Sequence, residues 1–106
     1  PVWVLLAVVI AFVVFLTELV SNTASAALLL PVLLPLAATL GLPAAGTAAA
    51  VALAASCAFM LPVATPPNAL VYATGQVPAG QMLRMGLWLN VLAIVLLTGL
   101  AGWAWA

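Results

Sequence analysis

Polar residues in this chain are concentrated in two short clusters, residues 17–23 and 64–68, and each cluster lies between long apolar segments. Hydrocarbon offers no hydrogen-bond partner, so backbone that leaves a helix at membrane depth is stable only inside protein or beside water. Pro66 and Pro67 restrict the second cluster further, because neither residue has a backbone N–H to donate. The two clusters therefore predict where helices in this chain are interrupted.

Charged residues are almost absent from the sequence. The 106 residues include one acid, Glu18, one base, Arg84, and no histidine. A soluble domain carries about 25% charged residues, whereas this chain carries 2% and is 70% hydrophobic. We therefore predict an all-α, multi-pass membrane protein in the lipid bilayer, with room for about four apolar segments. A basic face for nucleic acid is missing, so no nucleic-acid partner is expected.

The first polar cluster separates two apolar segments, residues 2–16 and 24–40. As a helix, residues 2–16 rise only about 22 Å, which is less than the roughly 30 Å of the hydrocarbon core. We predict a re-entrant helical hairpin over residues 1–42, with its tip at residues 21–23. The alternative is an ordinary pair of spanning helices joined by a surface loop, and periodicity does not separate the two.

Residues 43–78 are predicted to form one discontinuous transmembrane helix. Its apolar pieces, residues 47–61 and 70–77, are each too short to span the membrane but are long enough together. The residue before each proline is disfavoured in a helix, so we place the break at residues 63–68. A proline-kinked helix without a binding site is the alternative.

Residues 79–106 are predicted to form a C-terminal transmembrane helix. Asn90 is its lone central polar residue, and we expect it to form a hydrogen bond to another helix.

Catalytic chemistry is not supported by the residue types present. The chain has one cysteine, one glutamate, and neither histidine nor aspartate. A catalytic triad needs a base such as histidine, and a zinc site needs a cluster of ligating side chains. We therefore predict no enzymatic activity and no resident cofactor.

Neutral oxygen atoms are the groups that remain for binding. A hard cation such as Na⁺ prefers oxygen ligands, which the hydroxyl, amide and unwound backbone groups of the two clusters supply. The N-terminus of the second hairpin helix, near Asn22 and Thr23, is suited to an anion. Ser21 or Asn22 acting only as a helix cap is the alternative, and capping is compatible with binding.

Glu18 lies in the last turn of the first hairpin helix. An acid inside a membrane segment indicates function, but a helix C-terminus is unfavourable for negative charge. We expect a structural or tuning role for Glu18 ahead of direct ligation of a cation.

Two motifs carry a resemblance to a known family. Residues 16–24 read Leu-Thr-Glu-Leu-Val-Ser-Asn-Thr-Ala and resemble the Ser-Asn-Thr hairpin motif of the divalent anion:sodium symporter family. Residues 59–69 read Phe-Met-Leu-Pro-Val-Ala-Thr-Pro-Pro-Asn-Ala and resemble the unwound-helix motif of the same family. The motifs stand in the family's order and separation, and the resemblance covers essentially the whole chain.

The resemblance implies the C-terminal part of the second repeat of an inverted-repeat transporter. It implies import of di- or tricarboxylates of the succinate or citrate class, coupled to Na⁺ by alternating access. The implied partners are the substrate, Na⁺ as coupling ion, the N-terminal repeat of the same transporter and a second copy in a homodimer. The implied location is the cell membrane, which in bacteria is the inner membrane.

The resemblance also implies roles for individual residues. The residues implied to contact substrate or line its cavity are Ser21, Asn22, Thr23, Thr65 and Pro66. The residues implied to form a sodium site are Thr17, Val20, Asn22 and Ala64. The alternatives are an anion exchanger, a proton- or metalloanion-coupled relative, or a non-transporting membrane assembly subunit.

Overall fold

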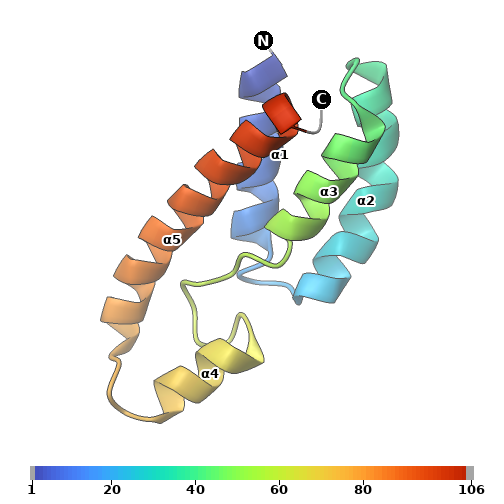
Figure 1. Cartoon of the computed structure of the whole chain (residues 1–106). Coiled ribbons are helices and arrows are strands. Elements are labelled where there is room, and N and C mark those ends of the chain that lie inside the picture. The colour runs from blue at the N-terminus through green and yellow to red at the C-terminus, as the bar shows by residue number, and fades with distance from the viewer. Residues whose placement is uncertain (1, 105–106) are drawn as a thin grey trace.

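The computed structural model describes the backbone of residues 2–104 and the side chains of residues 3–102. Figure 1 shows α1, α2 and α3 side by side, with α5 crossing α1 and α4 set apart at one end. No strand occurs in residues 2–104, so the prediction of an all-α protein is confirmed. The elements are α1 (Val2–Leu16), α2 (Asn22–Thr39), α3 (Ala44–Ala54), α4 (Pro66–Ala73), α5 (Ala79–Gly99) and the π-helical turn η1 (Leu100–Ala104).

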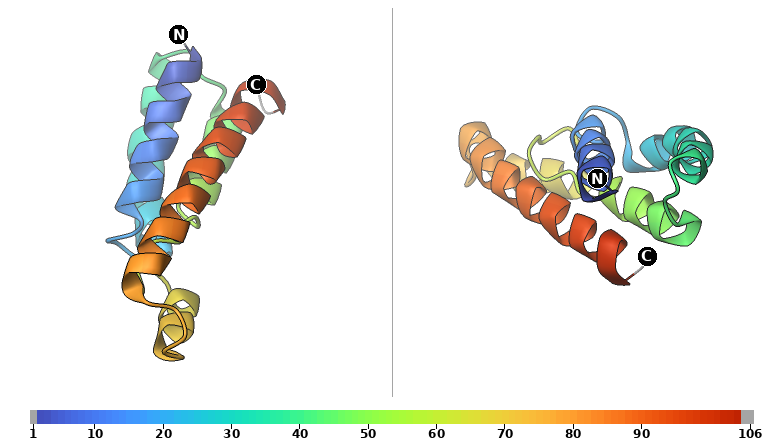
Figure 2. Two further views of the ribbon diagram at one scale, coloured as in Figure 1. Left: turned by 90° about the vertical axis from the view of Figure 1, so that its left-hand side faces the viewer. Right: turned by 90° about the horizontal axis from the view of Figure 1, so that it is seen from above.

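Helix α1 lies at the centre of the packing. Seen from above in Figure 2, it lies between α5 on one side and α2 and α3 on the other. Leu6, Ile10, Val13 and Val14 of α1 are at most 2% exposed. Their spacing of three or four residues places them on one helical face. This face packs against buried residues of α3 and of the C-terminal part of the chain.

Helices α1 and α2 form a hairpin. In Figure 1, the start of α1 and the connection from α2 to α3 lie at the same end of the molecule, and the tip between α1 and α2 lies at mid-height. The longest extent is 47 Å, whereas α1 has 15 residues and so rises about 22 Å. The tip therefore stops partway along the long axis, among the other helices.

The break between α3 and α4 is longer than predicted and begins earlier. Helix α3 ends at Ala54 and α4 begins at Pro66, so residues 55–65 form no helix. The discontinuous helix predicted over residues 43–78 is therefore interrupted at residues 55–65 and not at the predicted residues 63–68. The physical reason is tertiary, because side chains from other elements bind the backbone of residues 58–61.

Pro66 and Pro67 begin a helix instead of lying inside the break. They occupy the first positions of α4, where a missing N–H costs nothing because the helix leaves that donor unpaired anyway. The Thr65 hydroxyl accepts the backbone N–H of Asn68 at 3.2 Å and caps the same helix. The two prolines thus mark the end of the break and are not its cause.

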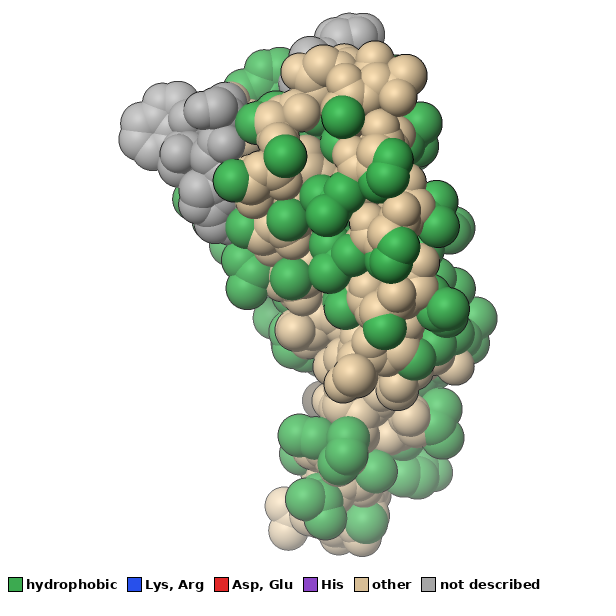
Figure 3. All heavy atoms as spheres, turned by 90° about the vertical axis from the view of Figure 1, so that its right-hand side faces the viewer, with side chains coloured by type: hydrophobic (Ala, Val, Ile, Leu, Met, Phe, Trp, Pro, Cys, Tyr) green, Lys and Arg blue, Asp and Glu red, His purple; other side chains and the backbone are tan. Residues whose placement is uncertain are grey.

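The outer surface of the chain is apolar, as expected for a membrane protein. Figure 3 shows a face on which hydrophobic side chains extend over the helices, with no Lys, Arg, Asp or Glu in view. Helix α2, with 18 residues, and residues 79–102, with 24 residues, are each long and apolar enough to cross a membrane. Large apolar side chains that face outward include Leu19, Leu28, Val63, Leu70, Trp88 and Val95.

Candidate functional site

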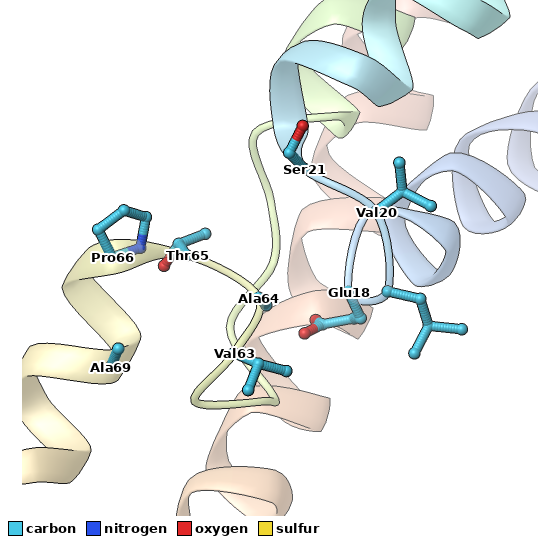
Figure 4. Close-up of a pocket in the computed structure, with 9 residues that line it drawn as sticks. Glu18, Val20, Ser21, Val63, Ala64, Thr65, Pro66 and Ala69 are labelled. Carbon is cyan, nitrogen blue, oxygen red and sulfur yellow. The ribbon is translucent and has the colours of Figure 1, made fainter.

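A pocket of about 370 Å³ lies between the hairpin tip and the end of the break. One wall is formed by residues 18–21, the turn that joins α1 to α2. The opposite wall is formed by residues 63–66 and Ala69, which end the break and begin α4. Figure 4 shows the two walls facing each other, with Glu18 projecting from the turn toward Ala64. The pocket thus brings together the two polar clusters of the sequence.

Two helices begin at this pocket. Ser21 lines it and caps α2, because its hydroxyl accepts the backbone N–H of Ala24 at 3.1 Å. Thr65 and Pro66 line the opposite wall, where α4 begins. The N-terminus of a helix carries the positive end of its dipole. The two helix N-termini therefore bring positive partial charge to the pocket, which is lined by the acid Glu18 and by no basic residue.

Oxygen atoms converge on the Thr17 side chain, behind the tip. Its Oγ1 lies 2.7 Å from Asn22 Oδ1, 2.8 Å from the carbonyl oxygen of Ala55 and 3.4 Å from the carbonyl oxygen of Val20. Thr17 is fully buried. A hydroxyl has one hydrogen and donates it to one acceptor at a time. Lone pairs therefore remain on the other oxygens, and this is the electron-rich environment that a hard cation requires.

The structure separates the predicted site residues into two groups. Thr17, Val20 and Asn22 meet at the Thr17 hydroxyl. Val20, Ser21, Ala64, Thr65 and Pro66 line the pocket. Val20 is common to both groups, so the oxygen cluster adjoins the pocket wall.

Three predicted site residues, Ala64, Asn22 and Thr23, are each absent from a group to which the prediction assigned them. Ala64 is almost buried in the pocket wall, and the oxygen of the break that contacts Thr17 is that of Ala55. Asn22 bonds to Thr17 and, like the exposed Thr23, is not among the residues that line the pocket.

Glu18 is a buried carboxylate held by neutral donors. Its oxygens accept the backbone N–H groups of Phe59, Met60 and Leu61 at 3.0–3.2 Å and the Asn90 side-chain amide at 2.6 Å. Glu18 is 4% exposed and Asn90 is fully buried. Three successive backbone N–H groups thus converge on one carboxylate. These hydrogen bonds are of the kind expected from a structural role of Glu18 and from an Asn90 side chain bonded to another element.

Asn68 makes two further hydrogen bonds that the sequence did not predict. Its side-chain amide donates to the carbonyl oxygens of Ala58, at 2.7 Å, and Leu61, at 3.0 Å. The only signal in the sequence was its place after the two prolines. Asn68 thus ties the first turn of α4 back to the middle of the break.

The family described as "Sodium:sulfate symporter transmembrane region" matches residues 1–106. The chain belongs to this family. The resemblance to divalent anion:sodium symporters that the two motifs carry is thereby confirmed. The description of the family identifies the matched residues as a transmembrane region.

Relatives within the sodium:sulfate symporter family include proteins named as transporters. An "Uncharacterized transporter" of Haemophilus influenzae is 50% identical over 97 residues, which are 92% of this chain and 21% of that protein. The "Sodium-dependent dicarboxylate transporter SdcS" of Staphylococcus saprophyticus is 44% identical over 94 residues, 89% of this chain and 18% of that protein. SdcS of Staphylococcus aureus is 41% identical over 81 residues, which are 76% of this chain and 16% of that protein. The chain spans about a fifth of the length of these relatives.

Proposed function

We propose that this chain forms part of a secondary transporter that imports di- or tricarboxylates together with Na⁺ by alternating access. The observation that carries the proposal is the meeting of oxygens from Thr17, Val20 and Asn22 beside the pocket. These three residues come from the turn and the first position of α2, so a cation bound there holds the hairpin tip in one shape. The sodium dependence named for SdcS supports Na⁺ as the cation.

The pocket is suited to a small anion without a basic side chain. The N-termini of α2 and α4 lie at its walls. Helix α4 begins with two prolines that have no N–H, so α2 is the helix whose N-terminus can bind a carboxylate or similar anion. The N–H groups of the first turn of α2 are directed toward this end of the helix. The single base, Arg84, is exposed on α5 and does not line the pocket. Anion affinity is therefore expected to depend on the cation bound next to it.

The remaining parts of the proposal concern the whole transporter. We propose that the hairpin is re-entrant, that an N-terminal repeat supplies the other half of the binding site, and that two copies form a homodimer. The dicarboxylate named for SdcS supports this substrate class. The apolar outer surface then contacts lipid, the N-terminal repeat or the second copy.

Substitution of Thr17 and Asn22 in the full-length transporter tests the proposal. Thr17→Ala removes one cation ligand, which we expect to cost about 1–3 kcal/mol, or about 5- to 150-fold in the Na⁺ concentration for half-maximal uptake. Asn22→Ala is expected to abolish Na⁺-driven uptake, because no single remaining group replaces its contact with Thr17. The measurement is uptake of labelled succinate into proteoliposomes as a function of Na⁺.

Thr39→Ala serves as the matched control. Thr39 is exposed near the other end of α2, and its hydroxyl bonds only to its own helix, at Pro35. We expect parental Na⁺ dependence for this variant. If Thr17→Ala and Asn22→Ala both retain the parental Na⁺ dependence at equal abundance, these residues are merely structural and the proposal fails.

A further inference from the structure

The carboxylate of Glu18 and the amide of Asn90 join three elements that are far apart in the sequence. Glu18 lies in the turn after α1, Asn90 lies in the middle of α5, and both bind the backbone of the break at Phe59. We call this arrangement the clasp, defined by the side chains of Glu18 and Asn90 and the N–H groups of Phe59, Met60 and Leu61. Within the clasp, the acceptors are two carboxylate oxygens and one amide oxygen, and all donors are neutral amides.

Helix α5 is shaped to receive this backbone. Gly86 is one turn before Asn90 and lies on the same helical face. A Cβ on Gly86 would overlap the carbonyl oxygen of Phe59 and the Cα of Met60. The absence of a side chain therefore lets the break approach α5 closely enough for Asn90 to bond both Phe59 and Glu18.

The clasp holds the segment that presents a carbonyl oxygen to Thr17. Ala55 is the C-cap residue of α3 and is 1% exposed. Its carbonyl oxygen lies 2.8 Å from Thr17 Oγ1. The clasp begins only four residues later, at Phe59. On the other side, Glu18 is the residue directly after Thr17. The clasp therefore fixes both partners of the Thr17–Ala55 contact.

This contact decides which way the Thr17 hydroxyl points. A cation at Thr17, Val20 and Asn22 binds a lone pair of Thr17 Oγ1, so the hydroxyl hydrogen must be donated to an acceptor elsewhere. The Ala55 carbonyl is that acceptor at 2.8 Å. Outer partners that orient a ligand in this way commonly change metal affinity about 10- to 100-fold when removed.

We propose that Glu18 and Asn90 are positioning residues for the cation site. They act through the backbone of residues 55–61, which they hold so that Ala55 orients the Thr17 hydroxyl and leaves its lone pairs to the cation. This inference rests on the proposed function, because it requires a cation at Thr17. Helix α5 contributes no residue to the pocket lining. Through Asn90, it nevertheless takes part in ion binding.

Exchanging the acid and the amide between the two positions provides the test. Glu18→Gln turns one acceptor into a donor that faces the Phe59 and Asn90 donors. Asn90→Asp sets two carboxylates against each other. The double variant Glu18→Gln/Asn90→Asp restores a donor–acceptor pair between the two side chains, because the new amide at position 18 donates to the new acid at position 90. That acid also accepts the Phe59 N–H, and the remaining oxygen of the amide accepts from the backbone of the break.

Two quantities are measured on the purified full-length transporter: succinate uptake against Na⁺ concentration, and the rise in Tm caused by NaCl relative to choline chloride. We expect each single variant to raise the half-saturating Na⁺ concentration by about tenfold or more and to reduce the Na⁺-dependent rise in Tm. We expect the double variant to recover most of both. Gln81→Ala, an exposed change on the same helix as Asn90, should match the parent.

The outcomes separate this inference from the proposed function. Single variants that lose abundance but keep the parental Na⁺ dependence overturn the positioning role, and so does a double variant no better than the worse single one. If the single variants show no uptake at all, the double variant gives the answer. Recovery of uptake in the double variant supports the positioning role, and no recovery overturns it. If Thr17→Ala also leaves the Na⁺ dependence unchanged, the cation site itself is absent and the proposed function fails first.

Discussion

Asn68 shows how a single side chain can determine local backbone structure. Its amide satisfies two carbonyl oxygens of the break, those of Ala58 and Leu61, which have no helical partners because residues 55–65 form no helix. Backbone oxygens that leave a helix inside a membrane protein need such a partner. Asn68 therefore makes the break stable, whereas Glu18 satisfies N–H groups of the same segment.

Asn68→Ala is expected to destabilise the protein by about 1–3 kcal/mol, because the carbonyl oxygen of Ala58 loses its side-chain donor. Asn68→Asp should be more harmful than Asn68→Ala, since it places carboxylate oxygens against two carbonyl oxygens. The measurement is Tm of the purified protein without substrate. If Asn68→Asp is as stable as the parent, these carbonyl oxygens have found other donors.

At the scale of elements, the close approach of α5 to the break depends on one glycine. Any side chain at Gly86 meets the backbone of Phe59 and Met60, which is itself bound by Glu18 and Asn90 and so cannot retreat freely. Gly99 lies in the same helix, and a Cβ there would meet nothing within 4 Å. The two glycines therefore form a matched pair for substitution.

Gly86→Ala is expected to destabilise the protein by about 1–3 kcal/mol, as overpacking does. Gly99→Ala should be neutral or slightly stabilising, because alanine is the better helix former. Thermal unfolding of the two variants provides the comparison. Equal Tm values for Gly86→Ala and the parent would contradict the close contact between α5 and the break.

At the scale of the whole molecule, the order of the elements along the long axis indicates how the chain sits in a membrane. The start of α1 and the connection at residues 40–43 share one end, and the connection at residues 74–78 lies at the opposite end (Figure 1). The 47 Å extent exceeds the roughly 30 Å hydrocarbon core. Both ends of the molecule can therefore reach water, and in the proposed re-entrant arrangement the hairpin tip lies between them, inside the membrane.

Accessibility to a membrane-impermeant thiol reagent tests this arrangement in the full-length transporter. In a cysteine-free background that includes Cys57→Ser, we expect Val4→Cys and Leu40→Cys to be labelled from the same side. Gln76→Cys, in the connection between α4 and α5, is expected to be labelled from the other side. Labelling of Val4→Cys and Leu40→Cys from opposite sides would contradict the hairpin formed by α1 and α2.

The sequence by itself determined the class of the protein and the presence of a helix interruption near each polar cluster. Two charges in 106 residues exclude a water-facing surface, and the polar clusters act locally, so no knowledge of distant contacts was needed for these two conclusions. The two motifs also carried the family, which the match over residues 1–106 confirms. For the same local reason, the sequence indicated that Thr17, Val20 and Asn22 lie near one another.

Only the tertiary structure decided where the third helix ends and what holds it open. The N–H groups of Phe59, Met60 and Leu61 are bound by Glu18, and that of Phe59 also by Asn90. Glu18 and Asn90 are 41 and 31 residues from Phe59. The contact of Ala55 with Thr17 spans 38 residues. Local propensity continues α3 through this apolar segment, because alanine and leucine favour helix. Partners from distant elements override that preference by binding the same backbone groups that a helix would use.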